Sequence, residues 1–227
     1  MNYDELVRKA SKEELTFYHD FWKQYIALEK LVLETEKYVA FSKDNENAYS
    51  IQYNILLQAI CAEVDVVIKR LCYEYDSQAE VHDMYDYIQL ITSHDSNFKD
   101  VKVRLQIYEM EIIPWKNIGI RQVNGENKLI CPYWWNGYID VKHKRLIFSL
   151  SANEFKISER NIRQAKQKNV LGALAGLFVL EEKCLEKMRA RYREEFKKYD
   201  FPSVTVEISD KFNDSIFQET IEVSENI

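Results

Sequence analysis

The stretch YSIQYNILLQAICAEVDVVIKRLC, residues 49–72, decides the fold class of this chain. Its apolar residues recur at alternating intervals of three and four, which is the period of one face of an α-helix. This period predicts a helix over about 48–75 with a buried stripe of Tyr53, Leu57, Ile60, Val64, Val67 and Leu71. A stripe of this kind is buried by packing against other helices, so we expect a mainly α protein.

Further segments show the same helical period. The first covers about 12–42 and begins in the sequence SKEE at 11–14. In this sequence Ser11 and Glu14 can cap the start of a helix by bonding to each other's backbone amides. A similar SQAE sequence at 77–80 predicts the start of a short third helix. Pro132 suits the first turn of a helix over about 132–150, and a long helix is predicted over about 160–199. Short connections favour an antiparallel helical bundle.

A small β-containing insertion is predicted between the third and fourth helices, over about 98–131. Residues 101–107 alternate between apolar and polar side chains, which is the pattern of a strand with one buried face. The dipeptide Asn124-Gly125 is typical of a tight hairpin turn.

The C-terminal part of the chain changes character after Pro202. Apolar residues alternate again over 203–208, so this segment is predicted to be extended and to add a strand to the insertion. We therefore expect a single helical-bundle domain over 1–200, which includes the insertion, and an extended C-terminal tail over 201–227.

Composition and charge exclude several classes of protein. The net charge of −6 argues against a general affinity for nucleic acid, which depends on neutralising phosphates. The N-terminal sequence MNYDELVRKA has no apolar core of a secretory signal. The longest apolar run, Val170–Leu180, is far shorter than the roughly twenty residues that span a membrane. We expect a cytoplasmic protein without membrane contact.

The four cysteines are typical of intracellular thiols. Cys61 and Cys72 fall on one predicted helix, where the rise per residue separates them by roughly 16 Å, too far for a disulfide. Cys131 and Cys184 are isolated, and the chain has neither a CxxC nor an HxxxH pair. No metal and no cofactor are therefore predicted.

The segment WWNGYIDVKHKR, residues 134–145, is the best candidate for an active centre. Asn136, Asp140 and His143 are spaced i, i+4 and i+7, so they share one helical face and are predicted as the catalytic residues. Histidine is the side chain that titrates near neutrality without perturbation. The alternative is a solvated or structural histidine. A basic cluster of Lys142, Lys144 and Arg145 surrounds His143 and is predicted to bind RNA.

Two segments resemble the HEPN superfamily of bacterial helical domains. WWNGYIDVKHKR, followed by NVLGALAGLFVL at 169–180, is similar to the C-terminal half of these domains, and 49–72 is similar to their second helix. The resemblance implies a four- or five-helix bundle that forms a homodimer. It also implies a role in bacterial defence or toxin–antitoxin systems, in which many members are metal-independent endoribonucleases encoded next to a partner protein.

The chain departs from the HEPN signature at one position. In that signature an arginine precedes the histidine by four to six intervening residues, and here His143 matches the histidine while Asn136 stands in place of the arginine. Neutral asparagine can donate a hydrogen bond but adds no positive charge for the transition state. Two hypotheses follow: a HEPN-like RNA-cleaving or RNA-binding protein, or a non-catalytic homodimeric protein–protein interaction module.

Two further features have more than one interpretation. Glu63 lies at the edge of the apolar stripe, where it either orients the site by approaching His143 or Arg145 or forms a structural ion pair, the interpretation we favour. The aromatic residues 133–135 either stack RNA bases or, as we expect, belong to the core.

Overall fold

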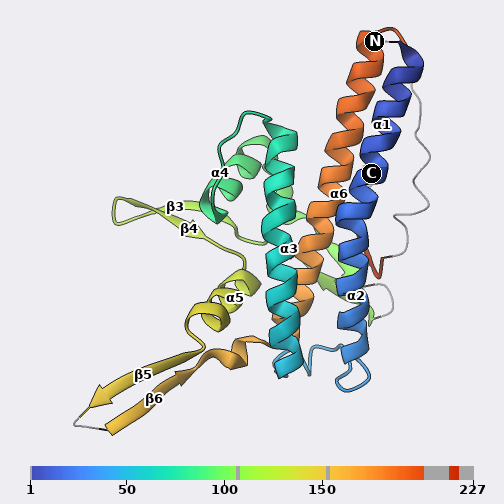
Figure 1. Ribbon diagram of the computed structural model, residues 1–227. Helices are drawn as coiled ribbons and strands as arrows, with labels where there is room; N and C mark the ends of the chain where they lie inside the picture. The colour runs from blue at the N-terminus through green and yellow to red at the C-terminus, as the bar shows by residue number, and fades with distance from the viewer. Residues whose placement is uncertain (1, 106–107, 152–153, 202–214, 220–227) are drawn as a thin grey trace, which may run out of the picture.

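The structure, a computed structural model, describes residues 2–105, 108–151, 154–201 and 215–219. Its body is a bundle of long helices, and two β-hairpins project from one side of it (Figure 1). The predicted fold class, a mainly helical bundle with a small antiparallel β insertion, is confirmed.

The first helical rod consists of α1 (Tyr3–Phe17), the π-helical turn η1 (Tyr18–Trp22) and α2 (Lys23–Thr35). The predicted bounds of 12–42 are wrong at both ends. The rod begins earlier because Asn2 and Glu5 form the capping box that was expected at 11–14. It ends earlier because the Gln167 side chain binds the backbone of residues 40 and 42 in a non-helical loop.

The second long helix confirms its predicted stripe, and the last one begins at 167 instead of about 160, because residues 154–164 form a strand and a 3₁₀ turn. Helix α3 (Ile51–Tyr75) begins at the N-cap Ser50, and the whole predicted stripe is buried. Helix α6 (Gln167–Lys198) starts beside α3, where the backbone of Ser50 donates to the carbonyl of Ala165. Figure 1 shows α3 and α6 running in the same direction, opposite to α1 and α2.

The short third helix, α4 (Met84–His94), begins later than predicted and packs on α3. Asp83 caps it by accepting from the backbone of residues 85 and 86, so the SQAE sequence at 77–80 is not a helix start. The apolar residue directly after this sequence, Val81, is buried from the loop that precedes the helix, so its position in the apolar pattern did not mark a helical turn.

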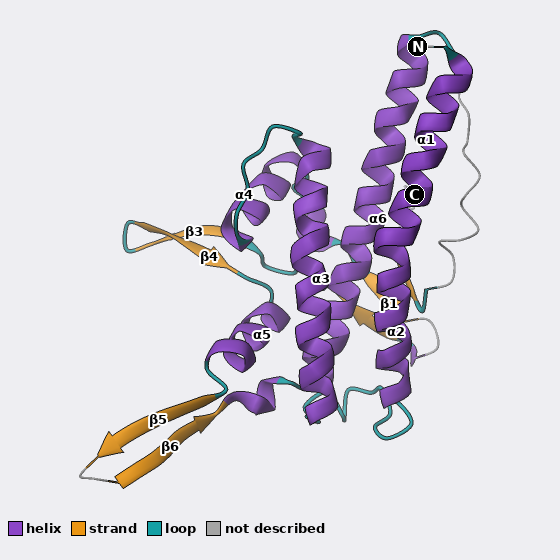
Figure 2. Ribbon diagram, viewed as in Figure 1, coloured by secondary structure: helices purple, strands orange, loops and turns teal. Residues whose placement is uncertain are grey.

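A three-stranded antiparallel sheet joins the insertion to the tail. Its order is β2 (Met110–Ile112), β1 (Val103–Leu105) and β7 (Phe217–Glu219), and β7 contacts α6 (Figure 2). The strand predicted over 101–107 is confirmed for β1, while 106–107 lie outside the described residues. The segment 203–208 also lies outside them, and the tail strand that pairs with β1 is β7.

The predicted turn at Asn124-Gly125 is present in the hairpin of β3 (Gly119–Val123) and β4 (Glu126–Ile130). Both turn residues have positive φ, 54° and 84°, which is the geometry that favours Asn-Gly.

Helix α5 (Tyr133–His143) is shorter than the predicted 132–150. It is followed by a second hairpin, β5 (Leu146–Ser151) and β6 (Glu154–Arg160), and by the 3₁₀ turn η4 (Asn161–Gln164), so residues 146–150 form a strand where the helix was predicted to continue. Asn161 binds the two carbonyls that follow the helix and holds the chain outside it: its side chain donates to Lys144 O at 2.8 Å and its backbone to Arg145 O at 3.0 Å.

Two buried tryptophans fix α5 against α6. Trp134 donates from its indole to Pro114 O at 2.8 Å, and Trp115 donates to Gly176 O at 3.1 Å. The two rings meet edge to face with centroids 5.2 Å apart. The core interpretation of the aromatic cluster therefore holds for Trp134, whereas Tyr133 is 37% exposed.

No helix in the described ranges combines the length and apolar character that crossing a membrane requires.

Candidate functional site

The candidate catalytic residues lie along the outer side of α5. Asn136 and His143 are exposed, and Asp140 is half-buried. Asp140 forms an ion pair of 3.7 Å with Lys144, one helical turn onward. Within the described part of the chain, the His143 side chain has no hydrogen bond or ion pair. His143 is therefore accessible to a large ligand, but no neighbouring group among these residues fixes its tautomer.

The predicted basic cluster is present at the carboxyl end of α5. Lys142, Lys144 and Arg145 are all exposed. The Lys142 ammonium lies 5.1 Å from the centre of the Tyr138 ring, and hydrogen bonding to Tyr138 raises the pKa of this lysine. Arg145 donates from Nε to Val141 O at 3.4 Å. The cluster is therefore a positive surface held close to the helix end.

The structure does not bring Asn136 and His143 to one reaction centre. Seven residues of α-helix separate them by about 10 Å along the axis. Asn136 lines a cavity near the start of α5, and His143 is not among the residues that line it. The arginine and histidine of a nuclease pair must reach the same phosphate, so this separation weakens Asn136 as a direct replacement.

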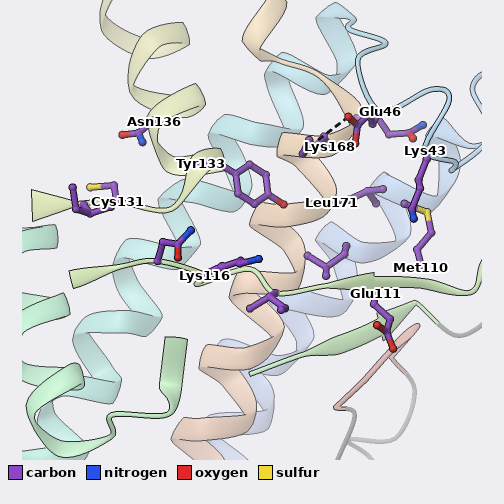
Figure 3. Close-up of a pocket in the computed structure, with 15 residues that line it drawn as sticks. Lys43, Glu46, Met110, Glu111, Lys116, Cys131, Tyr133, Asn136, Lys168 and Leu171 are labelled. Carbon is purple, nitrogen blue, oxygen red and sulfur yellow. Dashed lines mark hydrogen bonds and ion pairs between the residues drawn. The ribbon is translucent and has the colours of Figure 1, made fainter. Parts of the chain in front are cut away.

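The cavity that Asn136 lines has a volume of about 540 Å³. Figure 3 shows its wall, to which four parts of the chain contribute: the loop at 43–46, the segment 110–117, the residues from Ile130 to Asn136 in the first turn of α5, and the first turns of α6. Because these parts are far apart in sequence, local spacing gave no sign of the cavity. Asn136 is its one residue among the predicted site residues.

Tyr133 stands in the middle of the cavity wall (Figure 3). Its hydroxyl packs against Gly172 of α6 so closely that a Cβ there would collide with it. Burial raises the pKa of Tyr133. The hydroxyl is therefore a neutral hydrogen-bonding group at physiological pH, and the small residues of α6 allow it this position.

Glu63 does not belong to the α5 site. Burial raises the pKa of Glu63, and its charge in turn raises the pKa of Glu181, a fully buried glutamate of α6. The favoured structural ion pair is absent among the described residues. The burial of Glu181 was not predicted. In the sequence this glutamate directly follows the apolar run Val170–Leu180, a position that suggests an exposed side chain.

Within the described residues, no group of three or more His, Cys, Asp or Glu side chains is placed to hold a metal ion. Comparison with family models, with curated proteins and with solved structures gives no match to this chain.

Proposed function

We propose that this chain is a HEPN-like RNA-binding protein of a bacterial defence or toxin–antitoxin system, whose RNA site is the carboxyl end of α5. The observation that carries this proposal is the run of exposed cations, Lys142, Lys144 and Arg145, on both sides of the accessible His143. In a chain of net charge −6, such a cluster gives phosphates one local attractive surface.

RNA cleavage is the catalytic form of this proposal. His143 would take the proton from a ribose 2′-hydroxyl as its oxygen attacks the adjoining phosphate, and a neighbouring cation would stabilise the developing negative charge. Arg145 and Lys142 supply charge near His143, where Asn136 supplies none. Such a reaction needs no metal ion.

Binding and cleavage are measured separately. Fluorescence anisotropy of a labelled single-stranded RNA, repeated over a range of salt, gives the affinity and its salt slope. Replacing Lys142, Lys144 and Arg145 together by Gln should weaken binding and reduce the slope by about two, because each contact to single-stranded RNA contributes about 0.7. The matched control replaces Arg193, Lys197 and Lys198, three exposed cations at the far end of α6, by Gln.

Equal losses of RNA affinity in the two triple variants would contradict a site on α5.

Cleavage is tested by incubating the same RNA with the protein in EDTA. A matched oligonucleotide with 2′-deoxy sugars, which lacks the nucleophile, is incubated beside it. His143→Ala should abolish cleavage of the normal RNA and leave binding and the thermal midpoint nearly unchanged, since His143 is exposed. If the wild-type protein binds RNA without cleaving it, the proposal that it is an RNA-binding protein stands and the proposal that it is a ribonuclease is rejected.

The second candidate is a homodimeric interaction module, which a different surface favours. Four strongly exposed apolar side chains lie near the connection between α2 and α3: Leu31 in α2, Tyr38 in the turn after it, and Ile51 and Ile55 in α3, with Tyr38 at 87% and Ile51 at 73%. Leu31 and Tyr38 line a groove of about 430 Å³. Exposed apolar patches of this kind mark protein interfaces.

A second copy of the chain is the partner proposed for this surface, which we name the α2–α3 surface. Sedimentation at tens of micromolar should then show a dimer, and Ile51→Asp should convert it to a monomer. This change suits folding because an acidic side chain is favourable in the first turn of a helix. The control is Leu15→Asp, at an exposed apolar residue of α1. A wild-type monomer would reject this candidate.

A further inference from the structure

The cavity beside α5 has an excess of positive charge that the α5 site does not use. Lys43, Lys116 and Lys168 line it together with two carboxylates. Each carboxylate has a cation within reach: Glu46 pairs with Lys168 at 3.2 Å, and Glu111 pairs with Lys102, outside the cavity, at 3.8 Å. Among the described residues, Lys43 and Lys116 have no ion pair. Two ammonium groups are therefore available to an anion.

The amino end of α5 adds to this positive character. Pro132 is its N-cap and gives no side-chain cap, and residues Tyr133 and Asn136 of the first turn line the cavity. The first amides of a helix carry partial positive charge and are a recurrent binding site for phosphate. Lysines from two other segments and this helix end thus line the same cavity.

A large part of the cavity wall is apolar. Met110, Ile112, Ile113, Ile130 and Leu171 line it, and the Tyr133 ring is in its centre (Figure 3). A volume of about 540 Å³ lies within the roughly 300–1,000 Å³ of pockets that bind small molecules. A bare inorganic anion would leave the apolar wall uncovered. A ligand with both an anionic group and a flat apolar group would cover both parts.

We propose that this cavity binds a phosphate monoester that also carries a planar ring, with the phosphate at Lys43 or Lys116 and the ring against Tyr133 and the apolar residues of the wall. Neutral hydrogen-bonding groups at the rim, among them Asn136 and Asn117, are placed to contact polar atoms of the ligand. A nucleoside monophosphate and a simple aryl phosphate share this chemistry. The site does not depend on RNA binding at the carboxyl end of α5.

The test is isothermal titration of the whole protein with five compounds: adenosine 5′-monophosphate, adenosine, phenyl phosphate, phenol and inorganic phosphate. At least one of the two phosphate monoesters should bind more than tenfold more tightly than its own phosphate-free form and than inorganic phosphate. Tight binding of adenosine monophosphate alone assigns the ring to a nucleoside, and tight binding of both monoesters assigns a general aryl phosphate site. Binding of neither monoester would overturn the proposal.

Variants locate the site. Replacing Lys43 and Lys116 together by Gln should weaken the bound monoester at least about tenfold, since a hydrogen bond to a charged group commonly has that effect. The control replaces Lys12 and Lys198, two exposed lysines at the other end of the molecule, by Gln and should leave the affinity unchanged. The Gln variant of Lys142, Lys144 and Arg145 should also bind the monoester normally. Equal weakening in all three variants would overturn the proposal.

Discussion

The Trp134 indole lies directly on the backbone of Gly176, so that a Cβ placed on this glycine would be 2.8 Å from Cζ2 of the ring. The same glycine accepts the indole hydrogen of Trp115 through its carbonyl. Helices α5 and α6 therefore approach each other at a distance that only glycine permits. The position of α5, and with it the cavity and the basic cluster, depends on this contact.

Gly176→Ala should consequently destabilise the protein even though alanine favours helices more than glycine. Because Trp134 is fully buried, it has no room to move, and forced overpacking of a core costs about 1–3 kcal/mol. Urea unfolding followed by tryptophan fluorescence measures the change. A gain in stability, as expected for glycine to alanine in an uncrowded helix, would show that the two helices can separate without cost.

Substitution of Gly172, the other crowded glycine of α6, should have a different outcome. A Cβ at Gly172 would collide with the hydroxyl end of Tyr133, whose ring is partly exposed and can rotate toward the cavity. Gly172→Ala should therefore destabilise the fold less than Gly176→Ala and weaken the monoester ligand more. Thermal melts and titrations on both variants measure the two effects. If Gly176→Ala had the larger effect on both stability and monoester affinity, Tyr133 would have no specific role in the cavity.

The sequence predicted the long helices because each buries one regular stripe, and α3 follows its stripe over its whole length. It failed where distant residues decide the backbone. Helix α5 stops at His143, and Asn161, eighteen residues onward, binds the two carbonyls that follow the helix and holds the chain outside it. The 146–160 hairpin was missed for the same reason, since its pairing is not a local property.

The candidate site was predictable to a similar extent. Helical spacing correctly predicted that Asn136 and His143 lie on one exposed side of α5, because the spacing of residues around a single helix is a local property. The cavity was not predictable, since Lys43, Lys116 and Lys168 come from three separate segments that only the tertiary fold brings together.

The tail is attached to the bundle through Glu29 of α2, which leads to the next prediction. One carboxylate oxygen of this buried residue accepts hydrogen bonds from Tyr25 Oη at 2.5 Å, Ser215 Oγ at 2.9 Å and Ile216 N at 3.1 Å. Glu29→Ala removes the common acceptor, and losing a buried partner costs about 1–3 kcal/mol. Strand β7 should then separate from β1, which hydrogen exchange of its amides would detect. Unchanged protection of β7 would show that strand pairing alone holds the tail.

A cluster of charges joins α1, α3 and α6, and its pH dependence can be predicted. Glu13 accepts hydrogen bonds from Tyr192, Arg191 and Arg70. Burial alone would raise the pKa of Glu13, but these hydrogen bonds outweigh burial and lower it below 4.5. The folded state thus favours the ionised form, so its contribution is present above the unfolded pKa and is lost as pH falls through the lowered value. Glu13→Gln should cost about 1 kcal/mol at pH 7 and much less near pH 3, by urea unfolding. A pH-independent cost would indicate packing instead of charge.

Glu181 should show the opposite dependence. Its side chain is fully buried in α6, and neither carboxylate oxygen has a hydrogen-bond partner among the described residues. Burial, followed by the charges of Glu63 and Glu182, raises the pKa of Glu181 well above 4.5 in the folded protein. The folded state therefore keeps its proton while the unfolded chain loses it. Between the two pKa values the unfolded state binds fewer protons, so the free energy of unfolding falls as pH rises, by up to about 1.4 kcal/mol per pH unit.

Glu181→Gln replaces the carboxyl by a neutral group of similar shape and removes this loss. The free energy of unfolding of Glu181→Gln should be close to that of the wild type near pH 4.5. From pH 5 to pH 8 the variant should become progressively more stable than the wild type. Comparing the two proteins isolates Glu181, since all other titrating groups are common to both. Glu186→Gln, at an exposed glutamate one turn onward, is the control and should show no such trend. Glu63→Gln should lower the pH at which this stability difference stops growing, because it removes one of the charges that raise the pKa of Glu181. A difference that stays constant across this pH range would mean that Glu181 is ionised in the folded protein and has a partner charge.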